Sequence, residues 1–158
     1  MKTAIIFASK HGTSSKVAHQ LAALLGKDKT EIFNLKESVH LDLSNFESII
    51  LGGSIHAGGI QKSVRNFCTL HTVDLVQKPL GLFICCMDEQ RAMSEFETAY
   101  PELLRNHAKS RKVMGGEFLF DRLNFIEKFL VKKISGITST VSKIDEDKVR
   151  EMAVEMTN

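Results

Sequence analysis

Five short apolar segments alternate with helical patterns along this chain of 158 residues, and this alternation constrains its fold more than any other feature. The apolar segments are Ala4–Ala8, Thr30–Asn34, Ser48–Gly53, Leu80–Cys86 and Val113–Phe120. Four of them carry Ile, Val, Leu or Phe at successive positions, as strands buried on both faces of a parallel sheet do, whereas Thr30–Asn34 alternates. We therefore expect five strands in one sheet.

The segments between these strands repeat apolar residues at helical spacing. The repeats are Val17, Leu21, Leu24 and Leu25; Val64, Phe67 and Leu70 or His71; Phe96, Ala99, Leu103 and Leu104; and Val149, Met152, Ala153 and Met156. Pro101 should kink or split the third helix. A further helix is expected at Asp121–Ile134, before a final helix from Asp145.

Strands that alternate with helices favour a doubly wound α/β sheet, and right-handed crossovers leave few topologies for it. We predict a single domain over residues 1–158, with parallel strands in the order 2-1-3-4-5 and helices on both faces. In such sheets ligands bind beyond the carboxyl ends of the strands, where the strand order reverses. That point lies between the first and third strands.

Composition excludes several classes of function. The net charge is +2, from 21 basic and 19 acidic residues, so we expect no nucleic-acid partner. Cys68, Cys85 and Cys86 lack metal-ligand spacing and indicate free thiols, and we expect no metal site. The first apolar run is too short for a signal-peptide core, and no run is long enough to span a membrane. We expect a cytoplasmic protein.

The loop after the first strand, SKHGTSS over Ser9–Ser15, suits an anion. Gly12 lets successive N–H groups point inward, and the helix that follows adds its positive end. Hydroxyl and ammonium groups surround it: Ser9, Thr13, Ser14, Lys10 and Lys16. The alternative is that Thr13 or Ser14 only caps the helix, and the loop by itself does not decide between the two.

The loop after the third strand, GGSIHAGGI over Gly52–Ile60, holds two glycine pairs. Glycine permits a flat ligand to approach the backbone closely and permits a peptide to flip. His56 either flanks an aromatic ring or is an ordinary surface residue. The third loop, CCMDEQR over Cys85–Arg91, either borders the ligand through Met87 or is a plain connection.

Together these loops resemble the flavodoxin family, whose first loop has the pattern [ST]-x-x-G-x-[ST], matched by Ser9, Gly12 and Ser14. The resemblance implies a flavodoxin-like fold and FMN as cofactor. It implies that the 5′-phosphate is held by Ser9, Lys10, His11, Gly12, Thr13 and Ser14. It places Ser54, Ile55, His56, Ala57, Gly58 and Gly59 against the isoalloxazine ring, and Cys86, Met87 and Asp88 on its other side.

Within the family, MKTAIIFASKHGTSSKVA, IILGGSIHAGGIQKSVRNF and FDRLNFIEKFLVKKISG are similar to the flavodoxin-type, menaquinone-dependent protoporphyrinogen oxidases. Residues 88–112 are shorter and more acidic than in that branch, so the resemblance implies the flavin more directly than a porphyrinogen substrate. The expected function is an FMN-dependent oxidoreductase related to that branch or acting on quinones. The alternative is an electron carrier that serves a redox protein partner.

Two other functions match single features of the sequence. Cys85 and Arg91 form C-x5-R, the spacing of tyrosine phosphatases, but the loop between them has no glycine and two carboxylates. A receiver domain fails because the third strand ends in Gly52-Gly53-Ser54 and offers no aspartate.

The expected helix at 121–134 also has two interpretations. Its apolar stripe consists of Leu123, Ile126, Phe129, Leu130, Val131 and Ile134, with Lys128, Lys132 and Lys133 beside it. Such a helix either contacts a membrane surface peripherally, near quinones, or packs on the sheet with solvated lysines. The second arrangement is the commoner one.

Overall fold

The computed structural model describes residues 1–37, 40–118, 123–136 and 141–158. Its strands are β1 (Thr3–Phe7), β2 (Thr30–Asn34), β3 (Ser48–His56), β4 (Gly59–Ile60), β5 (Leu80–Cys85), β6 (Ser110–Val113), β7 (Gly115–Phe118) and β8 (Val141–Ile144). Its α-helices are α1 (Thr13–Leu25), α2 (Lys62–Leu70), α3 (Thr72–Val76), α4 (Ala92–Ala99), α5 (Glu102–His107), α6 (Phe125–Ser135) and α7 (Glu146–Thr157). Short 3-10 turns lie at Lys27–Lys29 and Leu43–Asn45.

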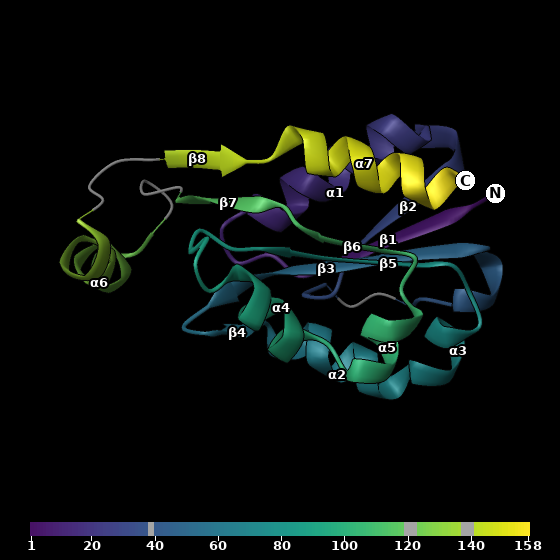
Figure 1. Cartoon of the computed structure of the whole chain (residues 1–158), viewed down its shortest axis with the longest axis horizontal. Helices are drawn as coiled ribbons and strands as arrows, with labels where there is room; N and C mark the ends of the chain where they lie inside the picture. Colours follow the sequence, from purple (N-terminus) through teal and green to yellow (C-terminus); the bar gives the residue numbers. More distant parts are fainter. Residues whose placement is uncertain (38–39, 119–122, 137–140) are drawn as a thin grey trace.

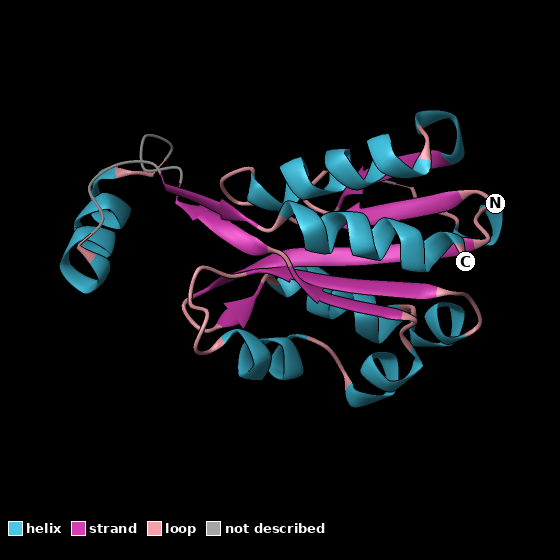
Figure 2. Cartoon of the chain, turned by 45° about the horizontal axis from the view of Figure 1, so that its top comes forward, coloured by secondary structure: helices cyan, strands magenta, loops and turns pink. Residues whose placement is uncertain are grey.

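The main sheet has the predicted topology. Its parallel strands follow the order β2-β1-β3-β5-β6, which is 2-1-3-4-5 in chain order, and β4 pairs antiparallel with the end of β3 (Figure 2). Phe7, at the end of β1, lies opposite Asn34 of β2 and Gly52 of β3. The strand order therefore reverses between β1 and β3, as expected.

Helices cover both faces of this sheet, with α1 and α7 on one face and α2 to α5 on the other (Figure 1). Along β1, Ile5 and Phe7 pack toward α1 and α7, whereas Ala4 and Ile6 pack toward the opposite helices. All four side chains are buried, which is why this strand is a continuous apolar run.

Pro101 splits the third predicted helix, as expected. α4 ends at Ala99 and α5 begins at Glu102, with Tyr100 extended between them because a residue before proline avoids the helical region. The Tyr100 hydroxyl is buried and donates to the Phe83 carbonyl at 2.5 Å. This tyrosine belongs to the core.

The predicted helical faces are partly wrong at their ends. Val149, Met152, Ala153 and Met156 are all buried in α7, as expected. Leu24, Leu70 and Leu103 instead point to solvent. In α1 and α5 the next leucine, Leu25 or Leu104, takes the inward position, because adjacent helical residues point about 100° apart, whereas Leu70 is the last residue of α2.

The predicted fifth strand, Val113–Phe120, is wrong in its position. The fifth parallel strand is β6, Ser110–Val113, which pairs with β5. The next residues form β7, which pairs antiparallel with β8, a strand that was not predicted. The apolar pattern did not indicate β6, because Arg111 and Lys112 interrupt it in this edge strand. Leu119 and Phe120 lie outside the described residues.

β7 and β8 form an arm that carries α6 beyond the carboxyl ends of the parallel strands (Figures 1 and 2). α6 begins later than the predicted helix, after a capping box in which Asn124 accepts from the Glu127 N–H and Glu127 accepts from the Asn124 N–H. Asp121 and Arg122 of the predicted helix lie outside the described residues. Within the described part of the chain, every helix is too short or too polar to cross a membrane.

Candidate functional site

The loop after β1 leaves the start of α1 open. α1 begins at Thr13, directly after Gly12, whose φ of 100° is left-handed and which has no side chain with which to cap the helix. The Ser9 hydroxyl accepts from the Gly12 N–H at 2.8 Å. The Ser14 hydroxyl bonds the Ser54 hydroxyl at 2.5 Å instead of capping. The capping alternative is therefore not observed, because the N-cap residue is Gly12 and both Thr13 and Ser14 lie inside the helix.

The loop after β3 is a hairpin rather than an open loop. β3 continues through His56, and the chain turns at Ala57 and Gly58 into β4. Both turn residues have positive φ, 49° and 78°, as in a two-residue type I′ turn. The expected ring-binding segment Ser54–Gly59 is thus partly strand, with its glycine-rich part at a tight turn.

The first glycine pair makes room for protein side chains. A Cβ at Gly52 would lie 2.1 Å from the ring of Phe83, and one at Gly53 would lie 2.5 Å from Gln61 Oε1. That Gln61 oxygen accepts from the Ser54 N–H at 2.9 Å. We expected these glycines to admit a flat ligand, and the structure assigns them to core packing instead.

The loop after β5 does not support a phosphatase. The Cys85 side chain is buried, and burial raises the pKa of its thiol to about 12, the opposite of what a thiolate nucleophile needs. Arg91 lies on the surface, and its Nε is 3.8 Å from Asp88. Asp88 also accepts from the backbone N–H groups of Gln90 and Arg91, as in an ordinary turn.

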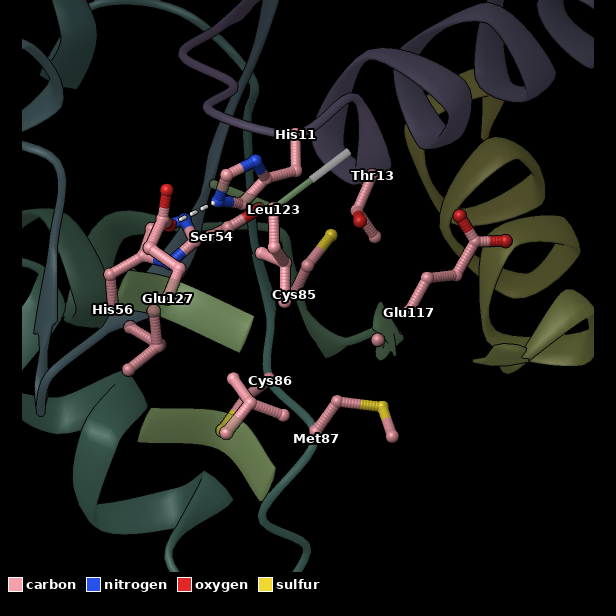
Figure 3. A pocket seen from close by; sticks show the side chains of 13 residues that line it. His11, Thr13, Ser54, His56, Cys85, Cys86, Met87, Glu117, Leu123 and Glu127 are labelled. Carbon is pink, nitrogen blue, oxygen red and sulfur yellow. Dashed lines mark hydrogen bonds and ion pairs between the residues drawn. The ribbon is translucent and has the colours of Figure 1, made fainter. Parts of the chain in front are cut away.

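A cavity of about 140 Å³ lies where these three loops meet (Figure 3). The predicted site residues that line it are His11, Thr13, Ser54, Ile55, His56, Cys86 and Met87. The remaining wall comes from Cys85, Gly116, Glu117, Leu123, Glu127 and Val131. The expected residues outside the lining are Ser9, Lys10, Gly12, Ser14, Ala57, Gly58, Gly59 and Asp88. Most of these residues belong to the loop after β1 or to the hairpin between β3 and β4.

The Flavodoxin domain family model matches residues 4–145 of the chain. The chain belongs to the flavodoxin family. Its match to protoporphyrinogen IX dehydrogenase [quinone] of Escherichia coli strain K12 is 22% identical over 147 residues, covering 86% of this chain and 81% of that protein. This relative comes from the branch that the sequence resembles.

Two solved structures show the same fold. The FMN-bound flavodoxin of Fusobacterium nucleatum has a TM-score of 0.53 at 15% identity and covers 99% of this chain and 98% of its own. The rubredoxin oxygen:oxidoreductase of Desulfovibrio gigas has a TM-score of 0.60 at 14% identity over 99% of this chain. This chain spans only 36% of that larger protein.

In this flavodoxin-family chain, the arm and α6 form a wall of the cavity that sequence reasoning missed. Leu123 and Val131 belong to the apolar stripe noted in the sequence, but their direction into the site was not predictable from it. Glu117 of β7 gave no signal in the sequence. Its side chain is 3% exposed, and its Oε1 accepts from Lys16 Nζ at 2.7 Å and from the Ser142 hydroxyl at 2.8 Å.

A carboxylate of α6 contacts side chains of the loop after β1. Glu127 Oε2 lies 2.9 Å from His11 Nε2 and 3.0 Å from Lys10 Nζ, and Figure 3 shows the His11 ring directed at it. The hydrogen bond from Lys10, followed by that from His11, lowers the pKa of Glu127. A negative charge thus already occupies the positively charged side of this loop.

His56 stands at the rim of the cavity, with its ring edge-on to His11 at a centroid distance of 5.7 Å. Burial of the ring, then the nearby His11 and Lys10, lower the pKa of His56 to about 4. The residue as a whole is exposed to solvent at the rim, and an imidazole with a lowered pKa is neutral near pH 7. A neutral ring at this rim suits an uncharged aromatic ligand better than an anion.

The residues present fit FMN in chemistry, but the cavity fits it only in part. The open α1 terminus and the hydroxyls of the first loop suit a phosphate, and the His56 hairpin and the Cys86–Met87 segment flank an apolar space. Small-molecule pockets usually measure about 300–1,000 Å³, more than this cavity offers. This cavity by itself is therefore too small to enclose a whole flavin.

Proposed function

We propose that this chain binds FMN non-covalently at the three loops and acts as a flavin-dependent oxidoreductase. The observation that carries the proposal is the uncapped N-terminus of α1, placed under a hydroxyl-rich loop where the strand order reverses. The match to the Flavodoxin domain model and the FMN-bound neighbour from Fusobacterium nucleatum support it.

In this proposal each loop has a separate task. The backbone N–H groups at the start of α1, including that of Ser14, and the hydroxyls of Ser9 and Thr13 would hold the phosphate, with Lys10 adding positive charge; the buried Ser14 hydroxyl is bonded to Ser54. The backbone of 54–59 and the segment 86–88 would hold the two sides of the ring system. Bound FMN supplies the redox chemistry, and the protein positions it.

The arm and α6 would control access to the ring. Leu123 and Val131 present apolar side chains to the cavity and would keep water from it. His56, neutral near pH 7, would add no charge beside the ring. We assign no described side chain as a general acid or base.

Quinones are our first choice of electron partner. The Escherichia coli relative is named for a quinone and for protoporphyrinogen IX, and it covers most of this chain. The segment 88–112 balances its five carboxylates with five basic side chains, so it offers no net positive charge to an anionic porphyrinogen, whereas a neutral quinone requires none. We also propose a cytoplasmic location, in keeping with the three free cysteines.

The cofactor is tested by the visible absorption spectrum of the purified protein, with the released compound identified by mass. Flavin bands with FMN in the supernatant are expected. A colourless protein that also fails to take up added FMN would overturn the proposal.

The phosphate loop is tested by Gly12→Asp. Aspartate at a φ of 100° strains the loop and places a carboxylate beside the phosphate, so FMN affinity should fall about a hundredfold or more. The matched control is Gly26→Asp, with a φ of 99° at the other end of the same helix. Titration of apoprotein with FMN measures both; equal affinities for the two variants would show that the loop does not bind phosphate.

The alternative role, an electron carrier for a protein partner, differs in what the reduced protein reacts with. As an oxidoreductase, FMN-loaded protein should turn over a soluble quinone or a porphyrinogen at a catalytic rate. Failure with both substrates, together with rapid electron exchange with a redox protein, would favour the carrier.

A further inference from the structure

α6 exposes an unusual amount of apolar surface for so short a helix. Five large apolar side chains point to solvent: Phe125 is 86% exposed, Ile126 69%, Phe129 58%, Leu130 47% and Ile134 83%. The helix itself lies at the outer end of the arm, away from the helices that cover the sheet (Figures 1 and 2). Neither of the two core clusters contains any of these five residues.

The side chains of α6 sort into rows spaced four residues apart. One row, Glu127 and Val131, lines the cavity. Two neighbouring rows, Phe125 with Phe129 and Ile126 with Leu130 and Ile134, form the outward face. The helix therefore has an inner side that belongs to the candidate site and an outer side that belongs to neither core cluster.

The charge of the outward side is positive. The carboxylate of α6, Glu127, is turned inward to Lys10 and His11. The three lysines, Lys128, Lys132 and Lys133, therefore lie beside the apolar rows with no carboxylate of the helix among them. Lys133 Nζ lies over the Phe129 ring, 6.0 Å from its centre, so its stem follows the apolar surface.

We propose that α6 is a membrane-docking helix that lies on an anionic lipid surface. Apolar side chains flanked by lysines match the interfacial region of a bilayer, where the former enter the acyl boundary and the latter meet anionic headgroups. A second copy of the chain fits less well, because a symmetric interface would bring the same lysines of both copies together. This surface does not depend on the proposed flavin chemistry. If that chemistry holds, docking places the cavity wall formed by α6 next to lipid-soluble quinones.

Vesicle flotation tests the docking. The purified protein is mixed with vesicles of phosphatidylcholine alone or with about a third phosphatidylglycerol. We expect the protein to float with the anionic vesicles, at least about tenfold more weakly with the neutral ones, and to be released by salt. No flotation with the anionic vesicles at low salt would overturn the proposal.

Variants locate the contact. Phe125→Ser with Phe129→Ser should lose flotation, whereas Leu70→Ser with Val73→Ser, which replaces two residues 78% and 67% exposed on α2 and α3, should retain it. Lys132→Glu with Lys133→Glu should also lose flotation. Its control, Lys27→Glu with Lys29→Glu, makes the same change of net charge at η1, Lys27–Lys29, near the start of β2. Unchanged circular dichroism and melting temperature confirm that each variant folds.

Two outcomes would contradict the assignment. One is that the phenylalanine variant floats as well as the parent chain. The other is that sedimentation in solution shows a dimer that this variant breaks, which would make a second copy the partner of α6. Both readouts are independent of flavin content, so failure of docking and failure of the proposed redox function are distinguishable.

Discussion

At the scale of single residues, Glu127 connects the arm to the phosphate loop. Its carboxylate takes the hydrogen bonds of Lys10 and His11, the two loop side chains best able to attract an anion. We expect Glu127→Gln to tighten FMN binding about three- to fivefold, because one solvent-accessible charge interaction is worth up to about 1 kcal/mol. Riboflavin, which lacks the phosphate, is the control ligand. Fluorescence titration of apoprotein measures both, and an equal gain for riboflavin would show that Glu127 acts on the ring instead.

At the scale of secondary structure, the sequence predicts elements well where burial is uniform. β3 and β5 are buried along most of their length and begin at their predicted residues, Ser48 and Leu80, and the break at Pro101 lies where expected, because an apolar run and a proline each act locally. The edge strand β6 is different: its Arg111 faces solvent, and the strand is defined only by its pairing with β5. The strand order predicts which loops form the candidate site. It does not predict that Glu127 belongs to this site, because tertiary contacts alone determine which side of α6 faces the cavity.

The pairing of β3 with β5 makes a testable prediction at this same scale. Gly52→Ala places a methyl group 2.1 Å from the buried Phe83 ring, and overpacking of this kind costs about 1–3 kcal/mol or more. Gly81→Ala in β5 is the control, because its closest neighbour is the flexible Met156 at 3.1 Å. Urea unfolding should show a clear loss for the first and a small one for the second. Adding Phe83→Leu should recover part of the loss; no recovery would mean that the ring is not the obstacle.

At the scale of the whole molecule, the reactivity of the three cysteines measures how the cores on the two faces of the sheet unfold. Cys68 belongs to the core under α2 to α5, and Cys85 belongs to the core under α1 and α7. Burial raises the pKa of each of these two thiols to about 12 and also raises the pKa of Cys86, which borders the cavity. In the native protein at pH 8, iodoacetamide should therefore leave all three essentially unmodified.

If the two cores unfold together, Cys68 and Cys85 should become reactive at one urea concentration, the midpoint seen by circular dichroism. Pulse alkylation followed by mass analysis of peptides measures each thiol separately. Cys86 should react first, because opening the α6 wall exposes it without disturbing either core. Modification of Cys85 well before Cys68 would instead mean that α1 and α7 leave the sheet independently. The phosphate loop at the start of α1 would then belong to the less stable half of the molecule.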